Sequence, residues 1–475
     1  MSSSYVGRGS RDYLEAGLIA MNAAILLLLG LGLVEGEGRC FFNRTEEHCV
    51  CHSLSQESLS SIIQCLPASV VEFWGGDLER YAALTISDLQ PSVIDMLETL
   101  NIRKLVFGDL LVPEVLLAQV LKFFSYTQVQ ELVFESCNFV GRSNWTEMAG
   151  QNLPILNLRF HNVTSAPLTG HEQGFSSLSG WLETLQELAV TSSHVTALPC
   201  AIGRVFRGLR SLDVAQNSLR DESLMPAFCE GAFPQLQLLS LQRNNLTSYH
   251  SVCESLQLLH ELQHLDLSEN KLIAGLASSC QWPMSLRVFN LSGTGLDEVL
   301  TPLPPNLEVL DMSCNHLRTL DISLASLKML FLSQNMLRDV SFVRNFPRLE
   351  ILHLDYNLIP ELPWDELRIL GHLRDVTAAG NPYNCSCSGA AGIQMLAGMV
   401  HLGPGWPRDY VCHSPPRYQG VLVKDVPVSV LQCNSAAVIT PICVILALLC
   451  VAGAVYLAQS RSGLFQACRR AVKGS

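Results

Sequence analysis

The chain has 475 residues, of which 48% are apolar and only 16% are charged. An average soluble domain has about a quarter charged residues, so this apolar excess needs a cause. The abundance of aliphatic residues excludes a disordered chain. The net charge of −12 resides mainly in residues 39–458, and an acidic body argues against nucleic acid as a partner, because clustered Lys and Arg side chains hold nucleic acid.

The first 38 residues have the pattern of a secretory leader. Residues 23–34 (AAILLLLGLGLV) are all apolar or glycine, and Gly36 and Gly38 follow on either side of Glu37. Such a run is long enough for the core of a signal peptide and too short to span a bilayer. We therefore predict a signal-peptide region at 1–38, with Met21 as an alternative start because acidic residues precede it. A buried helix of the mature protein is the competing interpretation.

Residues 436–458 form a second apolar run without a charge. As a helix this run would be about 34 Å long, enough to cross a hydrocarbon core of roughly 30 Å. Basic residues and no acids follow at 459–475, so this short tail is expected in the cytoplasm. The pattern predicts a single-pass type I protein of the plasma membrane with an extracellular ectodomain. A glycolipid-anchor signal is the alternative, although such signals do not usually carry a basic tail.

One pattern recurs between the two ends: apolar positions spaced as L-x-x-L-x-L, followed by Asn and a further apolar residue. This is the signature of leucine-rich repeats. Each L-x-L segment is expected to be a short strand whose leucines point inward, while the Asn side chain ties neighbouring turns through backbone hydrogen bonds. Stacked repeats bury one continuous core, which explains the apolar excess. The clear copies start at Leu209, Leu236, Leu262, Leu286, Leu307, Leu327 and Leu349, and weaker copies start at Ile102, Val129, Leu156, Leu185 and Leu373, after a first strand around residues 71–73.

The predicted fold is an α/β leucine-rich-repeat solenoid with a curved, parallel concave sheet. A solenoid exposes its core at both ends and needs caps there. Disulfide-rich N- and C-terminal caps and one transmembrane helix complete the prediction.

Most of the 17 cysteines lie upstream of the apolar run, between Cys40 and Cys433. Their number there is even, which predicts disulfides in an oxidising compartment. The last four of this set have the spacing of the cap of many extracellular repeat proteins, a resemblance that implies the pairs Cys385–Cys412 and Cys387–Cys433. Spacing alone allows three pairings, and a metal site is the alternative.

The other cysteines fall into groups by position. Cys40, Cys49, Cys51 and Cys65 form an N-terminal group, and two nearby pairs, Cys200 with Cys229 and Cys253 with Cys280, each span roughly one repeat. Cys137 and Cys314 remain, at or beside the Asn position of a repeat, and we predict that they are free and half-buried. Cys468 in the tail is either a palmitoylation site or a reduced cytosolic thiol.

Six Asn-x-Ser/Thr sequences support a surface glycoprotein. Asn290 lies between two inward residues of a predicted strand, so its glycan would project from the concave face and partly block that face. Asn384 directly precedes a cap cysteine and is not counted as an acceptor. The predicted acceptors are Asn43, Asn144, Asn162, Asn245 and Asn290.

Three segments carry a more specific likeness: CVCHSLSQESLSSIIQC at 49–65, RKLVFGDLLVPEVLLAQVLKFFSYTQVQELVFESCNFVG at 103–141, and the stretch from Cys280 through SLRVFNLSGTGLDEV to LEVLDMSCNHL. They resemble the monocyte differentiation antigen family, the leucine-rich co-receptors for bacterial lipopolysaccharide. The likeness includes cysteine placement outside the generic repeat. After about residue 330 the chain departs from the family, since it continues into a four-cysteine cap and a membrane helix where the family ends in a glycolipid anchor.

The resemblance implies an ectodomain whose N-terminal end opens into a hydrophobic pocket for acyl chains. Its implied partners are lipopolysaccharide and other acylated lipids, a lipid-transfer protein and a Toll-like receptor complex, with a homodimer left open. It also implies the disulfides Cys40–Cys51, Cys49–Cys65, Cys200–Cys229 and Cys253–Cys280. The predicted domains are then a signal region (1–38), an N-terminal cap with the first strand and candidate pocket (39–101), repeats (102–383), a C-terminal cap (384–434), a membrane helix (436–458) and a tail (459–475).

Candidate lipid contacts come from the irregular first repeats, because the segment at 84–97 fits no repeat template. The same side chains could instead only seal the end of the solenoid. The candidates are Val71, Phe73, Trp74, Leu78, Leu84, Ile86, Leu89, Val93, Ile94, Leu97, Leu105 and Phe107. Candidate cations for lipid phosphates, with solvated surface charges as the alternative, are Arg80, Arg103 and Lys104.

The chain carries no Gly-x-Ser-x-Gly elbow, phosphate loop or His-Glu-x-x-His motif. We therefore expect no enzyme, no cofactor and no metal. Two functions compete. The first is a pattern-recognition co-receptor of innate immunity that binds lipopolysaccharide and delivers it to a Toll-like receptor complex. The second is a leucine-rich adhesion or protein-ligand receptor that uses its concave face and has no lipid site.

Overall fold

The computed structural model describes residues 39–53, 63–77, 95, 98–141, 154–164, 183–273, 280–428 and 435–472. The predicted leader lies outside these residues. The chain divides into two compact units. Unit 1 extends to Met336 and includes Phe342–His353, whereas unit 2 comprises Leu337–Ser341 and the chain from Leu354 onward.

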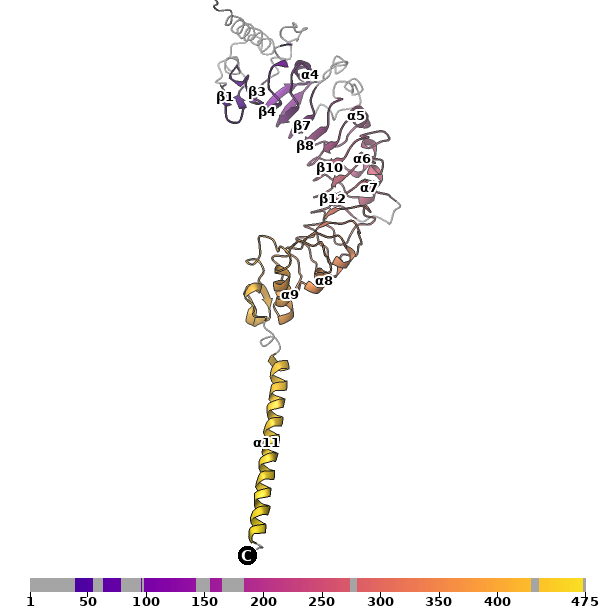
Figure 1. Ribbon diagram of the computed structural model, residues 1–475. Coiled ribbons are helices and arrows are strands. Elements are labelled where there is room, and N and C mark those ends of the chain that lie inside the picture. Colours follow the sequence, from indigo (N-terminus) through magenta and orange to yellow (C-terminus); the bar gives the residue numbers. More distant parts are fainter. Residues whose placement is uncertain are drawn as a thin grey trace, which may run out of the picture. The chain divides into compact units, whose positions relative to one another are not determined.

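Unit 1 is a repeat array built on one sheet whose strands follow each other mostly in chain order. Strands β2 to β5 and β7 to β15 pair in parallel, each with the next, and β6 pairs with β4. In Figure 1 the strands of this unit line the inner side of a curve, and helices α4 to α7 lie on its outer side. The strands are β1 (Arg39–Asn43), β2 (His48–His52), β3 (Val70–Asp77), β4 (Lys104–Pro113), β5 (Glu131–Glu135), β6 (Asn138–Val140), β7 (Asn157–His161), β8 (Glu187–Thr191), β9 (Ser211–Asp213), β10 (Leu238–Ser240), β11 (His264–Asp266), β12 (Val288–Asn290), β13 (Val309–Asp311), β14 (Met329–Phe331) and β15 (Ile351–His353). The helices are α4 (Glu114–Phe124), α5 (Cys200–Val205), α6 (Asp221–Ala227) and α7 (Tyr249–Leu256), with short 3-10 helices η1 (Ile63–Cys65) and η5 (Ser341–Asn345).

The repeat leucines form the core, as predicted. In the copy that starts at Leu262, that residue and Leu265, Leu267 and Leu272 are at most 4% exposed. Alternate residues of a strand point to opposite faces, so the residues between the leucines face the concave side. Burial of the leucines in every repeat supplies the hydrophobic free energy that holds adjacent turns together.

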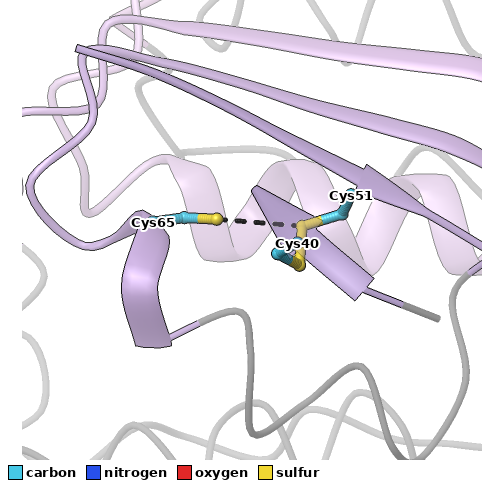
Figure 2. Close-up of side chains that lie close together, drawn as sticks. All are labelled: Cys40, Cys51 and Cys65. Atoms are coloured by element: carbon cyan, nitrogen blue, oxygen red, sulfur yellow. Dashed lines mark hydrogen bonds between the residues drawn. A yellow bond between two sulfur atoms is a disulfide. The ribbon is translucent and has the colours of Figure 1, made fainter. Parts of the chain in front are cut away.

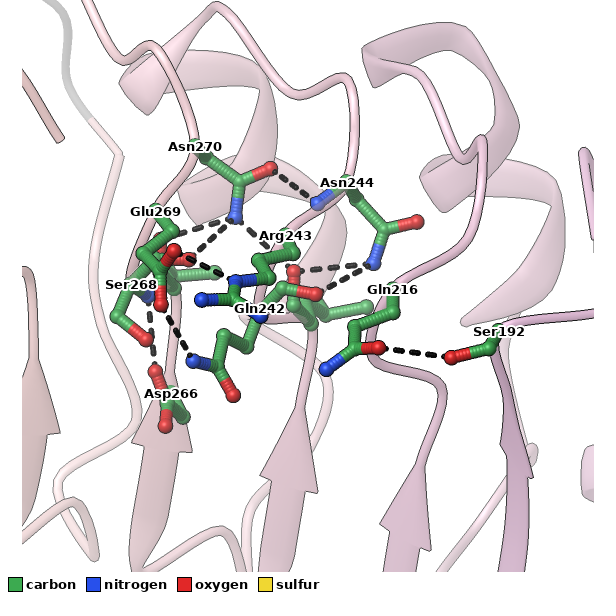
Figure 3. A network of polar contacts seen from close by, with 11 residues as sticks. Ser192, Gln216, Gln242, Arg243, Asn244, Asp266, Ser268, Glu269 and Asn270 are labelled. Carbon is green, nitrogen blue, oxygen red and sulfur yellow. Dashed lines mark hydrogen bonds and ion pairs between the residues drawn. The ribbon is translucent and has the colours of Figure 1, made fainter. Parts of the chain in front are cut away.

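The Asn positions form a hydrogen-bonded ladder (Figure 3). Asn270 is 1% exposed, and its Nδ2 donates to the carbonyl oxygens of Leu241 and Leu267 at 3.0 and 2.9 Å. Its Oδ1 accepts from the backbone N–H groups of Asn244 and Leu246 in the preceding turn. The amide therefore satisfies backbone groups that no strand or helix reaches, which confirms the predicted role of this position.

The N-terminal cysteines lie on an element that the sequence pattern missed. Strands β1 and β2 form an antiparallel hairpin, so the expected first strand, β3, is the third of the sheet. The hairpin and η1 carry the disulfides Cys40–Cys51 and Cys49–Cys65, and the outer side of unit 1 carries Cys200–Cys229 and Cys253–Cys280. These are the pairs that the resemblance implied.

Unit 2 contains the last repeat strand, the C-terminal cap and a long helix. Cys385, which directly follows β17, forms a disulfide with Cys412 of β18, and Cys387 is also disulfide-bonded, so these cap cysteines are not metal ligands. Cys433 lies outside the described residues. The elements are β16 (Asp375–Thr377), β17 (Tyr383–Asn384), β18 (Cys412–Ser414), α8 (Trp364–Leu367), α9 (Cys387–Ala397), η6 (Pro416–Tyr418), η7 (Val423–Asp425) and α11 (Ser435–Val472).

Helix α11 contains the predicted membrane span. Its segment Ile439–Ala458 is long and apolar enough to cross a bilayer, and none of it is buried. The helix continues to Val472, so most of the expected tail is helical.

Candidate functional site

The candidate lipid residues that the structure describes lie on two faces of the N-terminal strands. Val71 and Leu105 are each 2% exposed and belong to the closed core. Phe107 is also buried, at 9%, whereas Phe73 is half-buried. All four side chains point away from the concave face, toward the core of the solenoid. Strands β3 and β4 pair in register, and these residues alternate with residues that face the concave side.

Phe73 is the end of a row of stacked phenylalanines. Its ring lies 5.5 Å from that of Phe107, which lies 5.4 Å from Phe134, which in turn lies 5.3 Å from Phe160. The rings are within 22° of parallel. Phe134 and Phe160 are each 2% exposed, so exposure rises only at the N-terminal end of the row. The apolar core beneath the sheet is therefore less well shielded from solvent at Phe73 than at Phe107, one repeat later.

Trp74 lies on the opposite face of β3 from Phe73. Its Nε1 donates to Glu72 Oε2 at 2.8 Å, and Glu72 Oε1 lies 3.0 Å from His48 Nε2. The indole ring packs against Gly108 of the next strand. The sheet thus separates Trp74 from Phe73 and Val71, so the structure does not bring these three predicted residues together at one surface.

The other predicted lipid contacts lie outside the described residues. They are Leu78, Leu84, Ile86, Leu89, Val93, Ile94 and Leu97, and the candidate cation Arg80 lies there too.

The two remaining candidate cations differ in their surroundings. Arg103 is exposed. Lys104 Nζ lies 3.0 Å from Glu131 Oε1, so its charge is already balanced by a carboxylate. Glu131 also faces Arg159, which lies 3.5 Å from Glu187.

These residues form a ladder of alternating charge along the concave face of β4, β5, β7 and β8. This charge ladder was not predicted from the sequence. Its signal is the recurrence of charged residues at the solvent-facing positions of consecutive repeats.

The concave face changes character further along unit 1. From β10 to β15, the side chains at one solvent-facing position of each strand form a row that is mostly apolar and half-exposed. The residues of this row are neighbours in the sheet register: Leu238, His264, Val288, Val309, Met329 and Ile351.

A separate hollow of about 470 Å³ is lined by Asp297, His316, Arg318 and Met336. Its three charged or polar side chains make it unsuited to an acyl chain.

The described sequons differ in how their amides are held. Asn290 is half-buried on the concave side of β12, between Phe289 and Leu291, and its Oδ1 accepts from the N–H of Ser292. Asn384 is half-buried, and its Nδ2 donates to Glu361 Oε1 at 2.9 Å. Asn43, Asn162 and Asn245 are exposed, and Asn144 lies outside the described residues.

The two cysteines predicted to be free are free, but neither is half-buried. Cys137 is 1% exposed, and Cys314 is exposed. The Cys137 thiol donates to the carbonyl oxygen of Phe107 at 3.2 Å, and burial raises its pKa to about 11. This thiol is therefore protonated at neutral pH and unreactive.

Comparisons with known proteins agree with this architecture. The family pattern described as Leucine Rich Repeat matches residues 306–327. Toll-like receptor 2 of Mus musculus is 29% identical over 443 residues, covering 91% of this chain and 55% of the mouse receptor. Toll-like receptor 2 of Macaca mulatta is 31% identical over 355 residues, covering 73% of this chain and 45% of that receptor. This chain spans about half the length of these relatives.

A solved structure supports the fold. The crystal structure of the mouse RP105/MD-1 complex matches with a TM-score of 0.53 and 21% identity, covering 76% of this chain and 63% of that chain. With its repeat strands, asparagine ladder and capping disulfides, the chain is a leucine-rich-repeat protein related in sequence to Toll-like receptor 2.

Proposed function

We propose that this chain is a cell-surface pattern-recognition co-receptor of the monocyte differentiation antigen type. In this role it binds the acyl chains of bacterial lipopolysaccharide at the N-terminal end of unit 1 and delivers the lipid to a Toll-like receptor complex. Helix α11 would anchor it as a type I protein. The relationship to Toll-like receptor 2 supports a role in innate immunity.

The observation that carries the proposal is the incomplete cover of Phe73. This residue ends the row of stacked phenylalanines and is half-buried, while the next ring in the row, Phe107, is buried. Each methylene removed from water contributes about 0.8 kcal/mol, so one long acyl chain supplies on the order of 10 kcal/mol before ordering costs. Apolar contacts between an acyl chain and this end would therefore be sufficient to bind a lipid without strong charge attraction.

The charges of the described N-terminal strands support a mainly apolar mode of capture. Lys104 is paired with Glu131, which leaves the exposed Arg103 as the better candidate for a lipid phosphate. The solved RP105 structure contains a second protein, MD-1. By analogy, we propose that a second protein binds to the repeat array of this chain.

The test is a titration of the full chain in lipid nanodiscs with fluorescent lipopolysaccharide. Nanodiscs avoid detergent, which would compete for an acyl-chain site. The test variant is Phe73→Ser, and the control is Phe331→Ser, which removes a half-buried phenylalanine from the concave face of β14, far from Phe73. We expect saturable binding for the wild type and the control, and at least tenfold weaker binding for Phe73→Ser.

Circular dichroism and non-reducing mass analysis must show that both variants are folded with their disulfides intact. A wild type without saturable binding would refute the lipid site. Equal binding by a folded Phe73→Ser variant would refute its location.

The apolar row on β10 to β15 favours a second candidate, a receptor that holds a protein ligand on its concave face. The substitution Met329→Glu places a charge in the middle of this row. If this variant loses binding to responding cells or partner proteins while lipopolysaccharide binding is unchanged, the second function applies. A glycan at Asn290, next to this row, would restrict such a ligand, and Asn290→Gln would then increase binding.

A further inference from the structure

The two disulfides of the N-terminal hairpin are in direct contact. The Sγ atoms of Cys51 and Cys65 belong to different disulfides and lie 3.7 Å apart (Figure 2). Together with Cys40, their sulfur atoms lie within 4.8 Å of one another. This cluster holds no thiolate for a metal ion, because each sulfur is already bonded to another. A contact of this length is close to the separation from which one sulfur can attack another.

We propose that this cluster is a thiol–disulfide relay that converts the native pairs into Cys51–Cys65 in response to an external dithiol. A thiolate of the dithiol attacks Cys40 Sγ, which breaks the Cys40–Cys51 bond and releases Cys51 as a thiolate. The Cys51 thiolate attacks Cys65 Sγ, forms the Cys51–Cys65 bond and expels the Cys49 thiolate, which takes up a proton. The second thiol of the dithiol then resolves its mixed disulfide with Cys40.

The electrons and atoms balance over the whole sequence. The dithiol is oxidised to a disulfide, and the protein gains two thiols, at Cys40 and Cys49. One protein disulfide remains in place of two. The reaction therefore needs no reactant besides the dithiol.

The strand order explains why attack begins at Cys40. Among the described strands, β1 is the end of the sheet and pairs only with β2. Cys40 is 5% exposed, whereas Cys49, Cys51 and Cys65 are 0–2% exposed. An external thiol therefore reaches Cys40 with the least displacement of the fold. The buried Cys51 thiolate then meets the neighbouring disulfide at a much higher effective concentration than any thiol in solution.

The exchange changes how the end of the sheet is held. In the native pairing, Cys40–Cys51 ties β1 to β2, and Cys49–Cys65 ties β2 to η1. After exchange β2 remains tied to η1, whereas β1 is no longer joined to β2 by a disulfide and depends on its noncovalent contacts, among them the hairpin hydrogen bonds to β2. Cys51 is the register neighbour of Phe73 in β3, so the relay acts beside the residue that we place at the lipid opening. The relay chemistry itself does not depend on lipid binding.

The direct test maps the cysteines of the full chain in nanodiscs after brief treatment with dithiothreitol. Native free thiols are first blocked with N-ethylmaleimide, and newly formed thiols are then labelled with iodoacetamide under acid-quenched, denaturing conditions. Tandem mass spectrometry locates both labels. We expect new label on Cys40 and Cys49 and a retained Cys51–Cys65 linkage. New label on Cys40 and Cys51 with an intact Cys49–Cys65 bond would overturn the relay, as would a hairpin that stays fully oxidised until the chain is unfolded.

A variant tests the second step alone. Cys40→Ser leaves Cys51 without its partner, and incubation in a glutathione redox buffer should convert a measurable fraction of Cys49–Cys65 to Cys51–Cys65. The matched control is Cys200→Ser. This substitution frees Cys229, which follows α6, and should leave Cys253–Cys280 unchanged. Persistence of Cys49–Cys65 alone in folded Cys40→Ser protein would overturn the proposal. If Cys40→Ser does not fold, the mapping of the wild-type cysteines after dithiothreitol treatment still tests the relay.

Discussion

The indole ring of Trp74 occupies the space in which residue 108 would carry a side chain. A Cβ atom added to Gly108 would lie 2.3 Å from Cε3 of this ring, far inside van der Waals contact. The same indole is held on its other edge by the hydrogen bond from Nε1 to Glu72. Glycine at 108 therefore permits a bulky aromatic residue to lie flat across two neighbouring strands of the concave face.

The substitution Gly108→Ala should destabilise this end of unit 1. The ring must move away, which breaks its hydrogen bond to Glu72, and overpacking of this kind costs about 1–3 kcal/mol. Urea unfolding followed by tryptophan fluorescence will measure the change. The control is Gly371→Ala, because an added Cβ there meets no atom within 4 Å. Equal midpoints for the two variants would show that Trp74 is not packed as described.

The asparagine ladder should contribute more to stability than exposed asparagines do. Asn270→Ala removes the partner of several buried backbone groups and should lower the free energy of unfolding by about 2–4 kcal/mol. Asn306→Ala is the control, since its side chain donates an exposed hydrogen bond to the carbonyl oxygen of Met284. We expect a loss below about 1 kcal/mol there. Similar losses for both variants in urea unfolding would contradict a special role of the ladder.

The two free cysteines of unit 1 should react at very different rates. Cys314 is exposed, whereas burial raises the pKa of Cys137 to about 11, so its reactive thiolate is scarce at pH 8. Timed labelling of the native chain with N-ethylmaleimide, read by mass spectrometry, should modify Cys314 at least a hundredfold faster. Labelling of Cys137 should approach the rate of Cys314 only when the chain is unfolded. Fast labelling of Cys137 in the native state would mean that this part of the core is open.

The ion pair between Arg243 and Glu269, beside the asparagine ladder, should make stability depend on pH in the acidic range (Figure 3). Arg243 Nε lies 2.5 Å from Glu269 Oε2, and this hydrogen bond lowers the pKa of the Glu269 carboxyl. Because the folded-state pKa is the lower one, the contribution is complete above the ordinary carboxyl pKa and disappears as the pH falls through the lowered value. Both side chains are about half exposed, so the effect is small.

The measurement compares the urea midpoints of wild type and Glu269→Gln at pH 7 and pH 3. The wild type should be slightly more stable at pH 7, and the difference should be smaller at pH 3, because the carboxyl becomes protonated as the pH falls. Glu298→Gln is the control, at an exposed glutamate of the same unit. A difference as large at pH 3 as at pH 7 would show that the carboxylate charge is not the cause.

The sequence by itself was sufficient for the features that repeat. The leucine spacing identified the strands and their buried faces, and the Asn position identified the ladder, because each is set by hydrogen bonding and burial within one repeat and its neighbour. The cap cysteines were recognisable for a similar reason, since their spacing is local. The antiparallel hairpin before β3 was missed because it lies outside the repeat pattern.

Only the tertiary structure decided which side chains of different repeats meet. Lys104 and Glu131 are 27 residues apart in the sequence, and no local sequence pattern predicts that they form an ion pair. Repeat length varies along the chain, so the partner of a concave residue depends on the register of the assembled strands. The same holds for Trp74 on Gly108 and for the contact between the sulfurs of Cys51 and Cys65. Stacking of parallel turns brings such residues within contact distance, and the physical reason is that register is fixed by the whole packed core rather than by any single repeat.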